Sequence, residues 1–318
     1  MNAKRITAAL LLLLTLSGCS ARTEVRNKSF IRFVGIESGD EVTAAVSLYD
    51  SDEKLEGKGE TLFAAIADSE RSQGKSLFSG HMELFISNPQ NIYENLKTLI
   101  HNNRISPSCS VICTAEGADK LVMESDGSDI SDMLESSSRG GLVIKKNISS
   151  VLDDMMGADG KACVPVIKGG DIFMGVISRD RLLGTLNSDE SRGLCWLGNK
   201  IEDIYIPVTV NGKAVNFYVR KSTPKITAEK SGDSINITAE IKINGNPEEM
   251  QTDTAAVKDS LARQISGVCA KTIAKTVTGM KADVFGIEKS MNARGMSVGN
   301  WEEIIPHLNF SYKIKISE

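Results

Sequence analysis

The N-terminal segment of the chain determines the compartment in which the rest of the protein folds. Residues 4–5 are basic, residues 6–16 are apolar, and the small residues Ser17 and Gly18 lead directly to Cys19. A basic start, a short apolar run and a small-residue cleavage site are typical of a secretory signal peptide, and this run is too short to span a bilayer comfortably. A cysteine at this place is typical of a lipoprotein, in which it becomes the first mature residue.

Lipidation would tie the mature chain to a membrane surface. We predict a signal peptide over residues 1–18 and a lipidated tether over residues 19–29, with Cys19 carrying a diacylglycerol thioether. Each buried methylene contributes about 0.8 kcal/mol, so two acyl chains anchor a protein stably where one does not. The alternative is an ordinary secretory signal that happens to contain Cys19. The remainder of the chain should be a folded body outside the cytoplasm.

Composition excludes several classes of function. The net charge is −4 and both signs are interspersed, so no surface for nucleic acid is predicted. The three histidines, His81, His101 and His307, lie far apart and show no metal-ligand spacing. We therefore expect no metal site, no cofactor and no nucleic-acid partner.

The cysteines favour a body without a disulfide framework. Besides Cys19 the chain has five, an odd number: Cys109, Cys113, Cys163, Cys195 and Cys269. A two-residue period puts Cys109 and Cys113 on one face of a strand, roughly 13 Å apart at about 3.3 Å per residue. They cannot bridge each other in that geometry. We expect these cysteines to be small buried hydrophobic residues.

The first half of the mature chain alternates between strand and helix patterns. Strands are expected over residues 30–36 and 41–49, joined in a hairpin by the turn residues 38–40, and a charged loop over residues 50–60 comes next. Further on, apolar periodicity predicts helices over 62–74 and 92–100 and strands over 82–86 and 108–114. This order favours a mixed sheet with helices packed on it.

The middle and last parts differ in pattern. Short helices are expected around 130–134 and 148–155, then strands over 162–167, 172–177 and 181–186, and a helix for which Ser188 is the predicted N-cap. The last part contains a hairpin around Asn211 and Gly212, strands over 226–230 and 234–244, a long helix over 254–278 and a terminal strand ending near 316.

We predict an α+β fold with three domains. They are an N-terminal α+β domain over residues 30–125, a middle domain over 126–200 and a C-terminal domain over 201–318. The roughly 300 residues after the signal exceed what one hydrophobic core usually organises. The first two domains would hold mixed sheets packed with helices, and the third an antiparallel sheet backed by one long helix.

Several weak motifs, in order along the chain, resemble the Ger(x)C spore germination lipoproteins. The segments that carry the resemblance are residues 79–81, 170–173, 183–186, 190–194, 196–197 and 281–286, with Glu24 and Trp301. The lipobox, the lipoprotein processing motif at residues 16–19, agrees with it, and the resemblance covers nearly the whole mature chain. The motif positions, to which a structural or partner-contact role is assigned, are Gly80, His81, Glu190, Arg192, Gly193, Trp196, Asp283, Phe285, Gly286 and Trp301.

The resemblance implies the C subunit of a nutrient germinant receptor. Such a subunit is a lipoprotein on the outer face of the spore inner membrane, assembles with two polytopic membrane subunits and has no enzyme activity. The residues alone indicate a surface lipoprotein made of α+β parts.

Two other classes of function share some of these features. A surface-anchored solute-binding lipoprotein would have the same anchor, but its lobes repeat β-α units around a parallel sheet, whereas the last third of this chain has hairpins and one helix. An enzyme could pair Cys109 or Cys163 with His81 as thiolate and base, although nothing positive favours it. The spacing of Asp283, Phe285 and Gly286 is similar to a kinase motif, but the sequence contains no glycine-rich phosphate loop. A helix exit at Gly286 explains these residues better.

Overall fold

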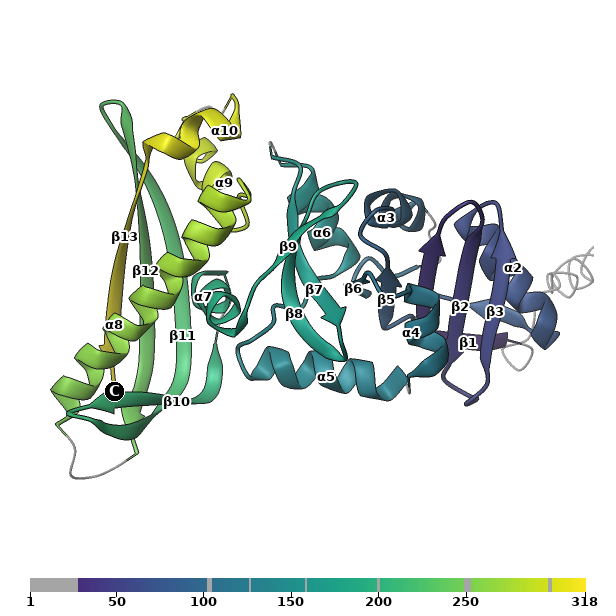
Figure 1. Ribbon diagram of the computed structural model, residues 1–318, viewed down its shortest axis with the longest axis horizontal. Helices are drawn as coiled ribbons and strands as arrows, with labels where there is room; N and C mark the ends of the chain where they lie inside the picture. The colour runs from purple at the N-terminus through teal and green to yellow at the C-terminus, as the bar shows by residue number, and fades with distance from the viewer. Residues whose placement is uncertain are drawn as a thin grey trace, which may run out of the picture.

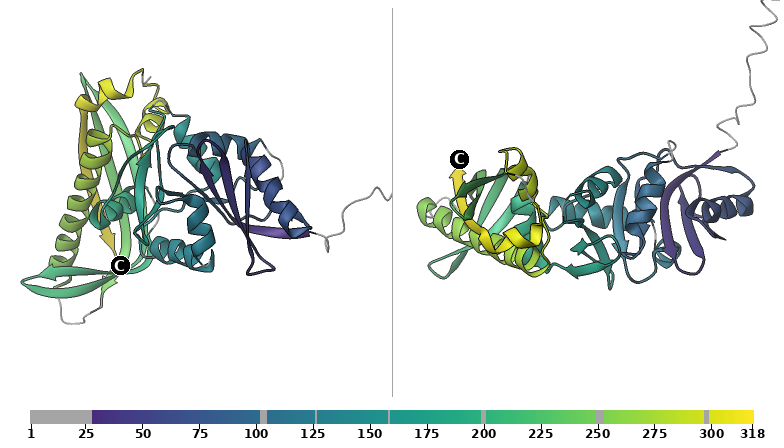
Figure 2. Two further views of the ribbon diagram at one scale, coloured as in Figure 1. Left: turned by 45° about the vertical axis from the view of Figure 1, so that its right-hand side comes forward. Right: turned by 90° about the horizontal axis from the view of Figure 1, so that it is seen from above.

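The structure is a computed structural model that describes residues 28–101, 105–125, 127–157, 159–198, 201–248, 253–296 and 299–318. Cys19, the predicted signal peptide and all but the end of the predicted tether lie outside these residues. The described chain is elongated, with the N-terminal strands at one end and the C-terminal sheet at the other (Figures 1 and 2). The helices of the described residues include none with the length and hydrophobicity that a membrane-spanning segment requires.

Nine strands of the described residues form the first sheet, in the order β3-β2-β1-β5-β6-β7-β8-β9 with β4 beside β1. They are β1 (Lys28–Ser38), β2 (Val42–Leu48), β3 (Lys54–Gly59), β4 (Ser76–Phe78), β5 (Leu84–Ser87), β6 (Ser110–Thr114), β7 (Ala162–Lys168), β8 (Asp171–Ile177) and β9 (Leu182–Thr185). β1, β5, β6 and β7 run parallel, whereas the outer pairs on both sides are antiparallel. The predicted mixed sheet and N-terminal hairpin are confirmed.

Helices cover both faces of the first sheet. One face packs against α2 (Leu62–Gln73), α3 (Ile92–Ile100) and α6 (Ile148–Met155). The other packs against α4 (Ala118–Glu124), α5 (Gly127–Arg139) and α7 (Ser188–Gly198). Within β6 the faces alternate as predicted, because Cys113 belongs to the first cluster and its neighbour Ile112 to the second. The sheet is therefore the middle layer of three.

The predicted charged loop over residues 50–60 is wrong, because β3 lies inside it. Its charged residues, such as Glu56 and Lys58, occupy the solvent-facing positions of an edge strand, while Leu55 is buried. Gly57 lies so close to α2 that an added Cβ would be 2.2 Å from the carbonyl oxygen of Ala65. The charged side chains favoured a loop in the prediction, although they belong to a strand with one face exposed to solvent.

The second sheet has the order β10-β11-β12-β13. Its strands are β10 (Glu202–Val210), β11 (Lys213–Ser231), β12 (Ser234–Pro247) and β13 (Leu308–Ser317). Asn211 and Gly212 both have positive φ, as a two-residue hairpin turn requires. The strands predicted separately around residues 214–220 and 226–230 are one continuous strand, β11. One face of this sheet packs against the long helix α8 (Thr254–Ile273), which is extended by the π-helical residues Ala274–Gly279.

The predicted antiparallel C-terminal sheet needs one correction, because β13 runs parallel to β12. The long helix α8, the short helix α9 (Ile287–Asn292) and α10 (Trp301–Ile304) all lie between β12 and β13 in the chain. They carry the chain back to the start of β12, so the next strand runs in the same direction. The pairs β10–β11 and β11–β12 are antiparallel as predicted.

The domain division predicted from the sequence remains a prediction. β6 precedes the predicted boundary at residue 125 and β7 lies beyond it, yet the two strands pair in one sheet. The strands of residues 30–125 and of 126–200 thus belong to a single sheet, and the structure separates more clearly into two sheets than into three parts.

Candidate functional site

Helix α7 lies between the two sheets and contributes to both cores (Figure 1). Leu194 is buried in the core of the first sheet, whereas Cys195, Trp196 and Leu197 belong to the core of the second. Successive residues of a helix point about 100° apart, so one short helix can fill two cores. We call this region, made of α7 and residues 280–289, the joint.

Gly193 allows α7 and α8 to cross at close range. A Cβ at this position would lie 2.1 Å from Thr272 Oγ1 and 2.4 Å from the carbonyl oxygen of Val268. Thr272 Oγ1 also donates to the carbonyl oxygen of Glu190 at 2.7 Å. Only glycine fits at this crossing, which assigns the motif residue Gly193 a packing role.

The first turn of α7 is held by a reciprocal cap. The backbone N–H of Glu190 donates to Asn187 Oδ1 at 2.9 Å, and the backbone N–H of Asn187 donates to Glu190 Oε2 at 2.9 Å. The N-cap is therefore Asn187 and not Ser188 as predicted. Lys275 Nζ lies 4.0 Å from Glu190 Oε1 and links the cap to the end of the long helix. The motif residue Glu190 thus fixes the start of the helix.

Arg192 and Trp196 line a small crevice beside α7. Its volume is about 70 Å³, and Gly141, Tyr205 and Gln264 contribute to its walls. Trp196 is only 3% exposed, so its ring is part of the core. Pockets for small organic ligands usually measure about 300 to 1,000 Å³. The crevice at these motif residues is much smaller.

Asp283 ties the C-terminal helices to the first sheet. Its carboxylate accepts the backbone N–H groups of Ile287 at 2.8 Å and Glu288 at 2.7 Å, and so caps α9. Its own backbone N–H donates to Asp159 Oδ2 at 2.7 Å, in the segment before β7. Burial raises the pKa of Asp283 to about 6, outweighing the lowering by the two N–H groups, and burial also raises the pKa of Asp159.

The other motif residues of the last region are also packed. Phe285 contacts the cores of both sheets, and Trp301 is 2% exposed in the core of the second. Gly286 has a φ of +67°, which favours glycine. The predicted helix exit at Gly286 is corrected to a helix entry, because this residue immediately precedes α9.

Gly80 and His81 lie away from the joint, near the start of β5. The His81 ring is 5.7 Å from the ring of Phe78 and 6.2 Å from that of Phe30. Its carbonyl oxygen accepts a hydrogen bond from the Tyr49 hydroxyl at 3.0 Å. The structure thus separates these two motif residues from those at the joint and places them beside β1 and β4.

The cysteines lack the properties of catalytic nucleophiles. Cys109, Cys113, Cys163, Cys195 and Cys269 are all buried and unpaired by disulfides. Burial raises the pKa of both Cys109 and Cys163 to about 12, so each is a neutral thiol at physiological pH. Cys109 Sγ lies 3.5 Å from the carbonyl oxygen of Ser110, and the His81 ring packs beside Phe30 and Phe78. Among the described residues, no group of three or more His, Cys, Asp or Glu side chains is placed to hold a metal ion.

Sequence reasoning missed the residues that complete the joint. Thr272 and Asp159 each contact a motif residue far away in the chain, and the cap is Asn187 rather than its neighbour Ser188. The pattern of Asn187 followed three residues later by Glu190 was the signal for the cap. No local pattern marks Thr272 or Asp159.

Comparisons with known proteins agree with this geometry. Residues 22–169 match the family described as "Spore germination protein N-terminal domain", and residues 174–317 match "Spore germination B3/GerAC like, C-terminal". The first match ends just after β7 and the second begins within β8, so the division between them lies inside the first sheet. A search of curated proteins finds no match.

A solved structure has the same fold. It is described as the crystal structure of the GerBC protein, with a TM-score of 0.60 and 17% identity, and the alignment covers 90% of this chain and 97% of that chain. At this identity the likeness shows the fold alone. Together with the two family matches, which span most of the sequence, it confirms the resemblance drawn from the motifs. The chain belongs to the Ger(x)C family of spore germination proteins.

Proposed function

We propose that this chain is the C subunit of a nutrient germinant receptor, required for germination and acting through protein contacts without chemistry of its own. Its family gives it a role in spore germination. In this proposal Cys19 carries a diacylglyceryl anchor, the body stands on the outer face of the spore inner membrane, and two polytopic membrane subunits are its partners.

The proposal rests on the structural roles of the motif residues at the joint. Gly193 permits a helix crossing, Glu190 and Asp283 cap helices, and Trp301 fills a core. The Gly193 crossing and the hydrogen bond between Asp283 and Asp159 hold one sheet against the other, whereas Glu190 and Trp301 stabilise the elements that meet there. A rigid arrangement of two sheets suits a subunit that must present fixed surfaces to partners, because preorganised surfaces bind with less ordering cost.

The lack of a reactive constellation supports the same proposal. An enzyme needs a nucleophile, base or metal arranged within reach of a substrate. The described part of the chain offers buried neutral thiols and a histidine packed beside two phenylalanine rings. The solute-binding alternative gains no support from the crevice at Arg192 and Trp196, whose volume is about 70 Å³.

The test combines deletion of the gene with a variant that lacks only the anchor. Deletion should abolish nutrient-triggered germination. Cys19→Ala should leave the body folded but remove it from the membrane fraction, and it should weaken co-purification with the membrane subunits, because tethering raises the effective concentration of the partners. Cys269→Ala, which alters a buried cysteine in the second core, is the matched control and should remain in the membrane fraction. Normal germination after deletion, or equal membrane retention of the Cys19→Ala variant, would contradict the proposal.

A further inference from the structure

We propose that the outer edge of β13 receives an extended segment of a partner protein, which adds a fifth strand to the second sheet and places acidic side chains against Lys313 and Lys315. This deepens the assembly role proposed above and rests on it for its biological setting. The inference depends on three features of β13: an open edge, an incompletely covered apolar stripe and an excess of positive charge.

The edge of β13 is long and open. β13 covers ten residues, and the sheet order ends with it, so no described strand pairs with its outer side. Along any strand, the N–H and C=O groups of alternate residues point toward each neighbour. An unpaired edge of this length is a template for another chain.

The other ends of the two sheet orders, at β3, β9 and β10, are each protected. At β3 the backbone N–H of Lys58 donates to Asp68 Oδ2 at 2.9 Å, from helix α2. β9 is only four residues long. β10 contains Pro207, which has no N–H, and the carbonyl oxygen of Thr209 accepts from Ser260 Oγ of α8 at 2.9 Å. β13 has neither a proline nor a short length to protect it.

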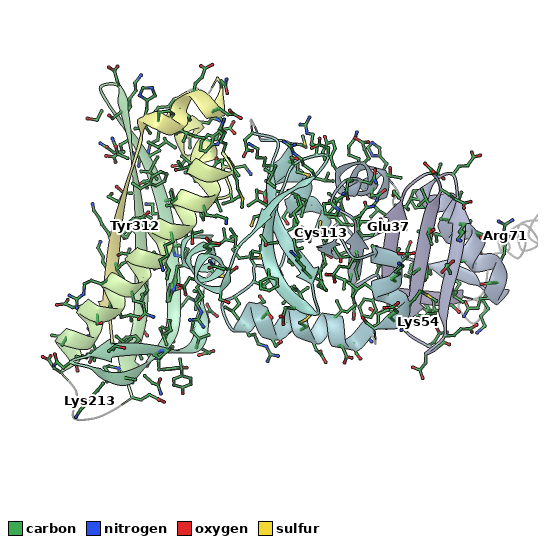
Figure 3. All side chains as sticks on the ribbon, viewed as in Figure 1. Glu37, Lys54, Arg71, Cys113, Lys213 and Tyr312 are labelled. Carbon is green, nitrogen blue, oxygen red and sulfur yellow. The ribbon has the colours of Figure 1, made fainter. Side chains whose placement is uncertain are left out.

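The apolar face of β13 is left partly uncovered. Five apolar side chains face the α8 side of the sheet and are only half-buried: Leu308, Phe310, Tyr312, Ile314 and Ile316. Their partners in β12 are buried, as Ile241 at 0% and Ile243 at 1% exposure show. Tyr312, labelled in Figure 3, lies in the middle of this stripe on β13. A strand beside β13 would seal the layer and bury further apolar area, at about 25 cal/mol per Å².

The opposite face of the same strand is positively charged. Lys313 and Lys315 are exposed there, and neighbouring strands add Lys225 and Lys242. Glu240 is the carboxylate among them, with Lys315 Nζ at 2.8 Å and Lys242 Nζ at 3.4 Å. Lys225 and Lys313 lie opposite Glu240 in the strand register, and within the described chain neither forms an ion pair. This face thus has four lysines around a single carboxylate, that of Glu240.

This charge favours an acidic partner over a second copy of the chain. Two β13 strands brought edge to edge would place their lysine-bearing faces side by side, and like charges across strands are destabilising. Lysines on an edge also discourage nonspecific pairing. A segment with apolar residues on one side and Asp or Glu on the other would match both faces of β13 and so be selected over other strands.

Two contacts hold β13 against its neighbours in the absence of a partner strand. Glu318, the residue after the strand, forms an ion pair with Lys258 of α8 at 2.8 Å. Ser311 Oγ lies 3.1 Å from Thr238 Oγ1 in β12 and connects the middle of the strand to its neighbour. The edge is therefore largely preorganised, which lowers the entropic cost of adding a strand.

The test uses two capped synthetic peptides of ten residues that alternate Val or Thr with Glu in one case and with Lys in the other. Binding to the full mature chain in detergent is measured by fluorescence anisotropy. The Glu peptide should bind at least tenfold more tightly than the Lys peptide. A third peptide, with the Glu sequence and N-methyl groups on alternate residues, should lose at least tenfold because it cannot complete the ladder.

Charge reversal at the edge should invert the preference. The double variant Lys313→Glu/Lys315→Glu should bind the Lys peptide more tightly than the Glu peptide. The control Lys213→Glu/Lys230→Glu makes the same change in net charge at exposed positions of β11 and should behave as the wild type. Equal binding of both peptides by the wild type, or an unchanged preference in the reversed variant, would overturn the proposal.

Two further outcomes separate the alternatives. Concentration-dependent dimers in analytical ultracentrifugation that disappear in the Lys313→Glu/Lys315→Glu variant would assign the edge to a second copy and also overturn the proposal. The peptide experiment requires no spores, so its failure is distinguishable from failure of the proposed function. If germination is lost on deletion while neither peptide binds, the assembly role stands and the β13 edge is not its surface.

Discussion

The two sheets of this protein differ in how much of each is covered. The first lies between two layers of helices, and strands such as β5 and β7 are apolar at nearly every position. The second has α8 on one face only, and β12 alternates between buried side chains and side chains that are partly or fully exposed. The first sheet is thus a scaffold with little free surface, whereas the second leaves a polar face and an open edge for contacts.

The difference in coverage between the two sheets is tested most directly by polar substitutions on both faces of one strand from each sheet. In β6, Val111→Asn and Ile112→Asn point to opposite helix layers, and both side chains are 0% exposed. Each should lower the free energy of unfolding by about 3 to 5 kcal/mol, because each buries an amide without partners. In β12, Ile237→Asn should have a similar effect, whereas Asn236→Ser on the exposed face should stay within about 0.5 kcal/mol.

Urea unfolding monitored by circular dichroism measures all four variants. If the two sheets differ in coverage, both β6 variants and the Ile237→Asn variant should lose much of the free energy of unfolding, and Asn236→Ser should not. Similar losses for Asn236→Ser and Ile237→Asn would show that the outer face of the second sheet is covered, and the contrast would be lost.

The joint between the sheets should be nearly as sensitive. In Gly193→Ala the new methyl group would meet the carbonyl oxygen of Val268 and Thr272 Oγ1, so α7 and α8 must move apart. A loss of about 2 to 4 kcal/mol is expected from this overpacking. Gly267→Ala on the exposed side of α8 is the control, because nothing lies within 4 Å of its added Cβ and alanine is the better helix former. If Gly193→Ala proves as stable as Gly267→Ala, the close crossing is not required.

Asp283 should make stability depend on pH. Its pKa is raised from the ordinary 3.8 to about 6, so between these values the folded state binds more protons than the unfolded state. The free energy of unfolding should therefore increase by about 2 kcal/mol as pH falls from 7 to 4.5. Asp283→Asn, which keeps an acceptor for the cap, should remove most of this increase.

A matched control for this pH dependence is Asp68→Asn. The pKa of Asp68 is lowered by the N–H of Lys58, so its titration lies below this pH range and the variant should keep the wild-type slope. Unfolding curves at half-unit pH intervals decide the matter. An Asp283→Asn protein with the full wild-type slope would refute the assignment to Asp283.

The smallest expected effect concerns the cysteines. All five in the described part are free, and Cys109, which immediately precedes β6, packs in the same core as Cys113 of β6 without bridging to it. Reductant should therefore change the melting temperature by less than about 1 °C, since a native disulfide would contribute about 2 to 5 kcal/mol. A drop of several degrees in reductant, measured by differential scanning calorimetry, would reveal a disulfide and contradict this expectation.

Local patterns predicted much of this architecture. The strict alternation around Ile237 and Ile241 and the turn at Asn211 and Gly212 correctly indicated the strands of the second sheet, because side-chain period and turn geometry are local properties. β3 was missed because its exposed charges resemble those of a loop. The parallel pairing of β13 was open to inference from the long intervening helix, but the upstream hairpins favoured the antiparallel alternative.

The site was less accessible to sequence reasoning than the fold. The motif residues Gly193 and Asp283 were identified, but their roles depend on Thr272 and Asp159, which lie far from them in the chain. Packing and hydrogen bonds across such separations are set by the tertiary fold and leave no periodic signal. His81 was grouped with the other motif positions, although the structure places it beside Phe30 and Phe78 and away from the joint.

We propose above that this protein works by assembly and without chemistry of its own. Spores carrying His81→Ala, Cys109→Ala or Cys163→Ala test it most directly, through nutrient response and subunit co-purification, each normalised to the amount of protein. The account predicts that activity falls only as far as the level of folded protein falls. A variant at normal abundance that stays on the membrane and co-purifies normally, yet does not germinate, would contradict it.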